Sequence, residues 1–449
     1  MSALLAGTLA SVKIDGYALA DAPKALRDDA KVVGAACAES GGALQFASER
    51  LKDDAATVAV AVKQQGEALA HASDRLRDDA ATVKHAASSS GWALRHASPR
   101  LRDDPAVVAL AAARDGSALR FASGRLRGDA AFVAKVGAAS AGVLAEADAS
   151  LRGDATVCAA CCARDGASLA LCDDAMRKDR AVVLAAVKSR GDALKDADPA
   201  FLKDAPVVLA AARTWSGALE ACAPALLADV AFVAAAVDVD PWNLQHASDA
   251  AAADVALVKR AVAKDGDALQ FAAPSLRSNA ALVAVAVECK GGTGEALAHA
   301  HEDLRCDPQL ALKAAKAHAA AVAHTPLRGD RAFAAKALKQ DPACFEFLAL
   351  ELRGDRKLAE VVAKHPGLLR HTPLRSDKKL VLAAVKKDGA ALRYASDDLR
   401  ACKDVVVAAV KSDAAALSHV LNRDALFKDK EVVAAAKKKG VDLAVAEED

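Results

Sequence analysis

The sequence has few aromatic side chains and no long hydrophobic run. Aromatic residues make up 3% of the 449 residues, whereas alanine alone contributes 119. So few large side chains cannot fill the cores of a few big globular domains, which favours many close helix contacts packed with small residues. The longest apolar runs, such as residues 230–237, end at an Asp and fall short of the roughly 18 residues that a membrane span needs. We therefore expect a soluble protein.

An excess of charge of one sign is also missing. The chain has 60 basic and 59 acidic residues, so its net charge alone implies neither a polyanionic partner nor an acidic membrane surface. Its ten cysteines are unevenly spaced, which favours reduced thiols in a reducing compartment over a disulfide framework. The first apolar stretch lacks a preceding basic segment, so we expect folded structure there and not a signal peptide. These features favour an intracellular, cytoplasmic protein, although they do not exclude an organelle.

A repeat of 25 residues organises the chain. Residues 76–100 align with residues 101–125 without a gap, and the same frame holds from residue 1 onward. Twelve regular units begin at 1, 26, 51, 76, 101, 126, 151, 176, 201, 226, 251 and 276, and six less regular ones begin at 304, 327, 352, 374, 399 and 426. We predict a regular array over 1–290 and a less regular one over 295–449. The Gly-rich insertion at 291–294 is then either a hinge or only a longer surface loop.

The columns of the repeat predict its helices. The fourth position is Asp in 15 of units 2 to 18, and Asp is a good N-cap because its carboxylate accepts hydrogen bonds from free backbone N–H groups. Proline follows this Asp at Pro105 and Pro308, as expected for a first helical position. A helix of about eleven residues then runs to a Gly at the sixteenth position, which predicts a left-handed helix stop. A second short helix or 3₁₀ segment carries an Ala-Leu pair.

Each unit is too small to bury its own apolar face, so stacking of the units must supply the core. This predicts an all-α protein, an α-solenoid of about eighteen helix-turn-helix repeats.

The repeat pattern resembles a known family. The motif L-R-x-D-x-x-V-V-x-A-A-V-x-x-x-G-x-A-L-x-x-A-S resembles the helical repeat of microbial eukaryotes and large viruses catalogued as domain of unknown function 4116, whose domain looks like two such units. The resemblance covers essentially the whole chain, more faithfully before residue 300, and implies no known activity. The unit length and the Asp-Pro helix start are also similar to the leucine-rich variant repeat, which alternates α and 3₁₀ helices in a right-handed superhelix. Both resemblances imply an α-solenoid.

One cluster of cysteines could suggest a metal or redox site. Cys158, Cys161, Cys162 and Cys172 fall in one unit, but a zinc site needs four converging ligands and other units hold Val or Ala at these four positions. We therefore interpret them as small core residues and expect no metal and no cofactor. The sequence also lacks a nucleotide-binding loop and a catalytic triad motif. We expect no catalytic residues and no enzymatic activity.

Two further columns allow a nucleic-acid alternative. The second position is basic in thirteen units, from Arg27 and Lys52 to Arg400. These basic side chains could follow a phosphate backbone, or they could form exposed ion pairs with the adjoining aspartates at 53, 78 and 103. A ring column holds Phe46, His71, His96, Phe121, His246, Phe271, His299, Tyr394 and His419. Its rings could stack on bases or pack between repeats, and we favour ion pairing and packing.

Residues 201–252 depart most from the pattern. The basic second position becomes Leu202, Leu227 and Ala252, and Trp215 and Trp242 occur in the same units. Apolar residues at a normally solvated column, close to tryptophans, are typical of a docking patch for a protein partner. A locally altered core is the alternative. We therefore predict a non-catalytic scaffold or architectural subunit that binds protein partners within a larger assembly, with partner-binding residues Leu202, Trp215, Leu227 and Trp242.

Overall fold

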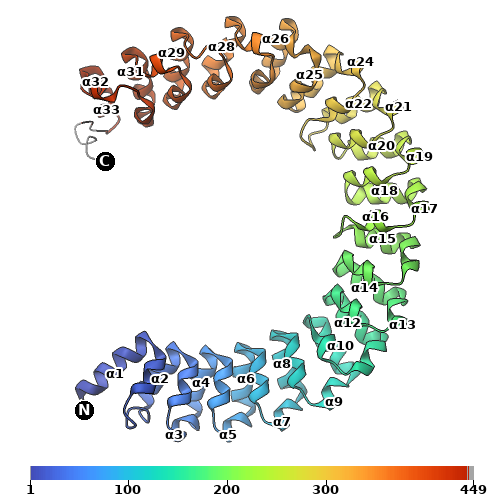
Figure 1. The fold of residues 1–449 in the computed structure, drawn as a ribbon, viewed down its shortest axis with the longest axis vertical. Coiled ribbons are helices and arrows are strands. Elements are labelled where there is room, and N and C mark those ends of the chain that lie inside the picture. The colour runs from blue at the N-terminus through green and yellow to red at the C-terminus, as the bar shows by residue number, and fades with distance from the viewer. Residues whose placement is uncertain (1, 442, 444–449) are drawn as a thin grey trace. The chain divides into compact units, whose positions relative to one another are not determined.

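The computed structural model describes residues 2–441 and residue 443, which form α-helices and 3₁₀ helices and no strand (Figure 1). The predicted all-α repeat fold is confirmed. The chain forms two compact units, Met1–Leu226 and Leu227–Asp449. The predicted boundary at residues 291–294 lies inside the second unit, and it stays a prediction. No helix in the described part of the chain is both long and apolar enough to cross a membrane.

Each repeat contains one long helix. Eighteen long helices are found among the described residues, one for each unit of the sequence pattern. They are α1 Ser2–Ile14, α2 Ala30–Glu39, α4 Ala55–Gln64, α6 Ala80–Ser89, α8 Pro105–Arg114, α10 Ala130–Ala139, α12 Ala155–Arg164, α14 Arg180–Ser189, α15 Ala205–Ala212, α18 Val230–Val239, α20 Val255–Val262, α22 Ala280–Glu288, α25 Pro308–Ala317, α26 Arg331–Gln340, α28 Arg356–Lys364, α29 Lys378–Lys387, α31 Lys403–Ser412 and α33 Lys430–Lys438.

The Ala-Leu segment that follows each long helix is usually a 3₁₀ helix. These 3₁₀ helices are η1 Gly16–Asp21, η2 Gly41–Phe46, η3 Gly66–His71, η4 Gly91–His96, η5 Gly116–Phe121, η7 Gly166–Leu171, η8 Gly191–Asp196, η10 Pro241–His246, η11 Gly266–Phe271, η12 Ala319–His324, η14 Pro342–Phe347, η15 Pro366–His371, η16 Gly389–Tyr394 and η17 Ala414–His419. Three units have one α-helical turn instead, namely α11 Val143–Glu146, α16 Ala218–Ala221 and α23 Ala296–His299.

A third short element, which the sequence pattern did not reveal, precedes most long helices and carries the Leu-Arg pair. It is helical for only about one turn, too short to show a periodicity of its own. Its copies are α3 Glu49–Lys52, α5 Asp74–Arg77, α7 Pro99–Arg102, α9 Gly124–Arg127, η6 Ala149–Gly153, α13 Asp174–Arg177, η9 Pro199–Lys203, α17 Pro224–Ala228, α19 Asp249–Ala252, α21 Pro274–Arg277, α24 Glu302–Arg305, η13 Pro326–Gly329, α27 Leu350–Arg353, α30 Asp397–Arg400 and α32 Arg423–Leu426.

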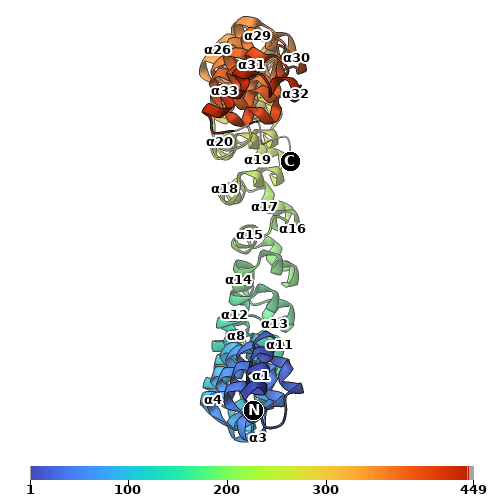
Figure 2. The same ribbon diagram turned by 90° about the vertical axis from the view of Figure 1, so that its left-hand side faces the viewer.

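The core lies between two rows of helices. Long helices pack on the long helices of the adjacent repeats, and the 3₁₀ helices form a second row against them. Val58 and Val62 of α4 and Leu69 of η3 are fully buried between these rows. In both units the one-turn helices run along the edge opposite the long helices, as Figure 2 shows for α17 and α19 against α18 and α20. Small side chains allow the rows to stack closely.

The predicted aspartate caps are confirmed. The Asp54 carboxylate accepts a hydrogen bond from the Thr57 backbone N–H at 2.9 Å, and Asp104 caps the helix that begins at Pro105. Asn279 caps α22 in the same way, whereas Cys402, the other exception in this column, makes no side-chain cap bond to α31. The free backbone N–H groups of the first helical turn need an acceptor, and this need explains why Asp recurs at the fourth position.

The glycine column has a different cause from the predicted left-handed stop, so that prediction is wrong. The positive-φ residues described are Gly142, Gly292, Gly294, Gly440 and Asn422, and none is a sixteenth-position glycine. Apart from Gly291, which lies in the loop before α23, most of these glycines instead begin a 3₁₀ helix against the next repeat. A Cβ on Gly41 would lie 2.4 Å from the Ala61 carbonyl oxygen, and one on Gly66 would lie 2.5 Å from that of Ala86. Close approach between repeats excludes a side chain there.

Candidate functional site

A hydrogen-bonded cluster of an aspartate, a serine and an arginine, which we call the bracket, recurs in the first compact unit. The Asp53 carboxylate accepts hydrogen bonds from the Ser73 hydroxyl and from Arg75 Nε, the latter at 3.0 Å, while Arg75 Nη2 donates to the Asp53 carbonyl oxygen at 2.5 Å. These contacts join the segment before one long helix to the one-turn helix before the next. The same arrangement links Asp28 to Ser48 and Arg50, Asp78 to Ser98 and Arg100, and Asp103 to Ser123 and Arg125.

The bracket corrects the predicted ion pairing. Asp53 pairs with Arg75 at the last position of the repeat and not with the second-position base, because Lys52 extends instead toward Glu49, at 2.9 Å. The hydrogen bond from Ser73, followed by that from Arg75, lowers the pKa of Asp53. The sequence signal was a Ser-x-Arg at the end of the four repeats that close at residues 50, 75, 100 and 125. Its role becomes clear only once its spatial partner is known.

Most second-position arginines are half-buried, although Arg328 and Arg375 are exposed, and some of them hydrogen-bond to backbone carbonyl groups. Arg305 Nε donates to the His324 carbonyl oxygen at 3.0 Å, and Arg400 Nε donates to that of His419 at 2.9 Å. In the first unit the Nε atoms of Arg77 and Arg102 are buried without a hydrogen-bond partner. The burial of these Nε atoms supports a packing role for the inner part of the two side chains.

The ring column packs between repeats. Phe121 lies edge-on to Trp92 with ring centroids 5.3 Å apart, and the Trp92 indole N–H donates to Asp115 at 2.8 Å. Phe46 lies edge-on to Tyr17 in the same way, at 6.3 Å. Burial lowers the pKa of His71. Aromatic pairs of this geometry stabilise the contact beyond their buried area, so these rings act as inter-repeat contacts.

Two segments of the chain match a known family model, and each segment covers nearly two 25-residue repeats. The model of a domain of unknown function, DUF4116, matches residues 58–102, which run from inside α4 to the end of α7, and residues 377–423. Each match spans nearly two 25-residue units, as the sequence resemblance implied. These two segments are similar to DUF4116 repeats. No curated protein and no solved structure shows significant similarity to it.

The cysteine cluster, which lies outside both matched segments, is in the core. Cys158, Cys161, Cys162 and Cys172 are all buried, and the Cys158 thiol donates to the Arg152 carbonyl oxygen at 3.2 Å. Burial raises the pKa of Cys161 to about 12, so its thiol is a poor nucleophile at neutral pH. Over the described range, no group of three His, Cys, Asp or Glu side chains is arranged to hold a metal ion.

The four predicted partner-binding residues belong to different compact units. Leu202 and Trp215 lie in the first unit, where both are half-buried and the Lys195 ammonium lies 4.8 Å from the centroid of the Trp215 ring. Leu227 and Trp242 lie in the second unit, where Leu227 is half-buried and Trp242 is exposed. Neither unit alone therefore contains the whole predicted patch.

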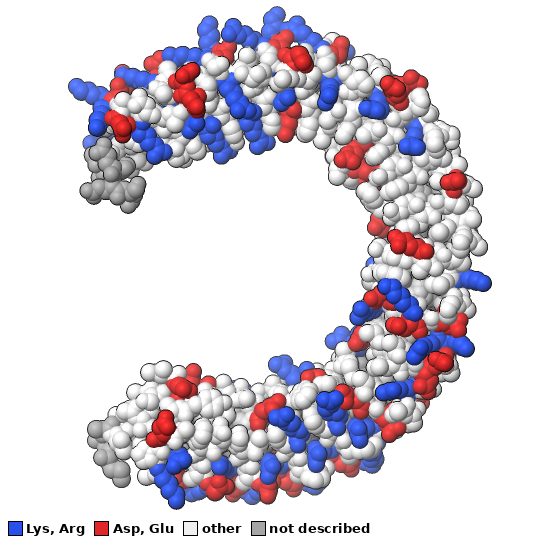
Figure 3. Space-filling model, viewed as in Figure 1, with Lys and Arg blue, Asp and Glu red and all other residues white. Residues whose placement is uncertain are grey.

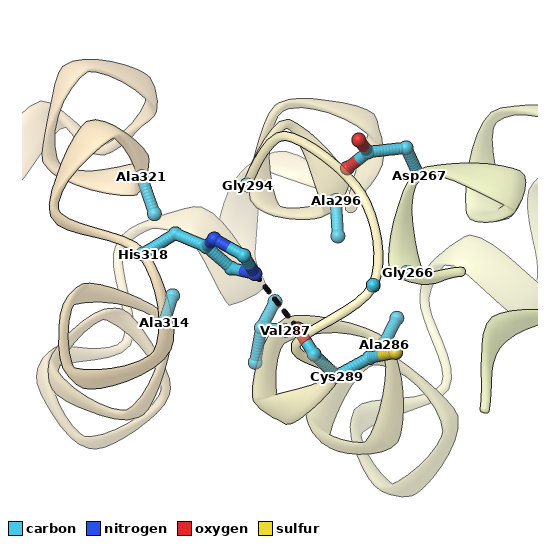
Figure 4. A pocket seen from close by; sticks show the side chains of 11 residues that line it. Gly266, Asp267, Ala286, Val287, Cys289, Gly294, Ala296, Ala314, His318 and Ala321 are labelled. Atoms are coloured by element: carbon cyan, nitrogen blue, oxygen red, sulfur yellow. Dashed lines mark hydrogen bonds between the residues drawn. The ribbon is translucent and has the colours of Figure 1, made fainter. Parts of the chain in front are cut away.

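The glycine insertion is tied to its surroundings by hydrogen bonds (Figure 4). The buried Asp267 carboxylate accepts from the Thr293 N–H at 2.5 Å and from the Thr293 hydroxyl at 2.9 Å. His318 Nε2 lies 2.9 Å from the Cys289 carbonyl oxygen, at the start of the loop. The space enclosed behind these residues is too small for a ligand. The loop is therefore held in place at both ends, and the hinge stays a prediction.

Proposed function

We propose that this chain is a non-catalytic scaffold that binds protein partners within a larger assembly. Stacked repeats present long continuous surfaces, which repeat proteins commonly use for binding. The observation that carries the proposal is a set of exposed apolar side chains on α18, η10 and α20 of the second unit. Val230 is 38% exposed, Val239 36%, Trp242 41% and Val255 50%.

The segment that holds these four residues has an unusual charge pattern. Residues 227–258 contain five Asp and no Lys or Arg, and Figure 3 shows few charged side chains over this part of the second unit. Val230 and Val255 are the first residues of their long helices, where units 2 to 18 otherwise carry Ala, Pro, Arg or Lys. Because both valines are exposed, they do not stabilise the core. Their apolar area is stabilising only when another surface covers it.

Trp242 is held in a fixed orientation just past the C-terminal end of α18, whereas Val230 and Val255 begin their helices. Its indole N–H donates to Asp265 at 2.9 Å, and its ring lies edge-on to Phe271 with centroids 5.4 Å apart. A tryptophan that is already ordered loses little conformational freedom when a partner covers it. This arrangement supports Trp242 as an anchor for a protein partner.

A matched pair of variants tests the proposal. Val230→Arg with Val255→Arg places two cations on the apolar surface, whereas Ala55→Arg with Ala80→Arg makes the same change at the equivalent helix starts of the first unit. We expect quantitative affinity capture from the source cells to lose specific partners with the valine variant and to retain them with the alanine variant. Partners unchanged by the valine variant would remove the apolar surface from the proposal.

Nucleic-acid binding along the arginine and ring columns is the alternative function. The contacts of Arg305, Arg400 and Phe121 within the array support a structural role for these columns instead. Phosphate contacts give an affinity that falls with rising salt. We expect no such salt-dependent binding of a labelled single-stranded oligonucleotide that depends on these columns. Binding that is lost in Arg77→Ala with Arg102→Ala would favour the alternative over the scaffold.

A further inference from the structure

A lysine occupies the same place in each of the last six long helices. It is the last or the second-last residue of the helix, and the set is Lys316, Lys339, Lys364, Lys386, Lys411 and Lys438, which we call the lysine column. At the equivalent place the first twelve units carry four basic residues, two acidic residues and six that are Ala or Ser. The second compact unit, residues 227–449, therefore ends in a continuous basic column that the first compact unit, residues 1–226, lacks.

The column lysines have no partners within the described residues. All six are exposed, and none forms an ion pair or donates a side-chain hydrogen bond there. Other lysines of the same helices do pair, for example Lys313 with Glu288 at 2.6 Å and Lys403 with Asp429 at 2.9 Å. A helix dipole favours a cation in any last turn, yet it acts on all eighteen long helices alike. It does not explain why the column is confined to the last six.

The six lysines are arranged as one row. Successive long helices from α25 to α33 pack on one another, and packed helices lie roughly 10 Å apart. The lysine column therefore extends over about 50 Å at that spacing. Figure 3 shows Lys and Arg side chains gathered over this part of the second unit.

A groove with both apolar and charged lining residues lies along the column between α26 and α28. It has a volume of about 490 Å³, and its apolar lining includes Ala335, Leu338 and Val361. Lys339 and Lys364 of the column also line it, with Lys357 beside them and Glu360 as the one carboxylate of the lining. The groove thus combines apolar walls with an excess of positive charge.

We propose that the lysine column binds an extended acidic segment of a partner protein, with an apolar side chain of that segment in the groove between α26 and α28. An extended chain in the polyproline II conformation has three residues per turn and advances about 3.1 Å per residue, so every third side chain points to the same side and faces a new helix layer. A segment with an acidic residue at every third position therefore matches the column in both spacing and charge. This surface is separate from the apolar one on α18 and α20, and it does not depend on the role of that surface.

The observations favour a peptide over a nucleic acid. Single-stranded nucleic acids are usually bound by aromatic side chains that stack on bases, but the long helices from α25 to α33 expose no Phe, Tyr or Trp. Phe333, the one aromatic residue of these helices, is buried. The apolar lining of the groove also has no counterpart in a phosphate backbone, whereas a leucine side chain of a peptide would fit it.

The test measures binding of a labelled peptide to the full chain by fluorescence anisotropy. The peptide has about 18 residues in repeats of Glu-Ser-Leu, a length that spans the column when extended. The test variant is Lys339→Glu, Lys364→Glu and Lys386→Glu. The matched control is Lys290→Glu, Lys428→Glu and Lys430→Glu, three exposed lysines of the same unit outside the column. Both variants change the net charge equally, and circular dichroism checks their helical content.

We expect the test variant to weaken peptide binding about tenfold or more, a change of about 1.4 kcal/mol, and the control variant to change it less than about twofold. Lys→Gln at the three column positions should weaken peptide binding less than Lys→Glu does. This neutral variant replaces the Glu variant in the test if the Glu variant does not fold. The wild-type chain should bind the Glu-Ser-Leu peptide more tightly than a peptide with Ala in place of each Leu. The ratio of these two affinities should be smaller for Leu338→Ser. Equal losses in the two charge variants, tighter binding of an oligonucleotide of equal charge at the same salt, or no peptide binding would each overturn the proposal.

Discussion

The contact between α10 and α12 allows a sharp test of how repeats pack. Gly137 of α10 lies at a core position where neighbouring units carry a side chain, such as Ala112, Cys162 and Val187. A Cβ on Gly137 would lie 2.4 Å from Cys161 Sγ, well inside the roughly 3.5–4.0 Å of a normal contact. Most other units have Ala at the position of Cys161. The missing side chain of Gly137 therefore makes room for the sulfur of Cys161.

The magnitude follows from two opposing effects. Gly137→Ala overpacks a buried contact, which costs about 1–3 kcal/mol, whereas Ala in a helix interior is better than Gly by about 1 kcal/mol. We expect a net loss of about 1 kcal/mol when Cys161 is present. In the Cys161→Ala background the clash is gone, so Gly137→Ala should stabilise the array by up to about 1 kcal/mol.

The assay is hydrogen exchange of the α10 and α12 amides in the four proteins of this double-mutant cycle. Local exchange is suited to a repeat array, whose units can open separately. We expect a coupling free energy of about 1–3 kcal/mol between the two positions. A coupling below about 0.5 kcal/mol, or stabilisation by Gly137→Ala with Cys161 in place, would refute the packing argument.

Two further predictions follow from the glycine column and the brackets. Gly66→Ala should lower the free energy of unfolding by about 1–3 kcal/mol because its Cβ would clash with the next repeat. Gly34→Ala should not lower it, because the space around Gly34 is open. Hydrogen exchange around each site compares the two variants, and equal effects would contradict the close approach at Gly66. Hydrogen bonds lower the pKa values of Asp53, Asp78 and Asp103, so their stabilisation is complete above the unfolded value of about 4 and is lost as the pH falls through the lower folded values. The melting temperature of the wild type should therefore fall more steeply below about pH 4 than that of the triple Asn variant, and parallel curves would contradict the brackets.

Much of the fold could be predicted because the relevant contacts are local. Asp54 caps its own helix within three residues, so the recurrence of Asp at this position marks most helix starts without knowledge of the tertiary structure. The apolar pairs of the long helices also follow from spacing within one element. These local signals repeat eighteen times, and their repetition predicts both the number of units and their stacking.

The remaining features depend on contacts between repeats. Gly66 is required by the Ala86 carbonyl oxygen, which lies twenty residues away in sequence, so the glycine was misinterpreted as a helix stop. The partner of Asp53 was misassigned because Arg75 comes close only after the repeats stack. Likewise, the exposure of Val230 and Val255 follows from how the helices pack and not from residue type. Their contribution to the candidate surface could not be predicted from the sequence.

The central claim is that a protein partner covers the apolar surface on α18 and α20. Photo-crosslinking tests it most directly, with a photoreactive amino acid at Val255 and, as the control, at Ala80 of the first unit. We predict that Val255 yields a discrete cross-linked protein partner in the source cells and that Ala80 yields none. The same labelling at both positions, or none at either, would contradict the account.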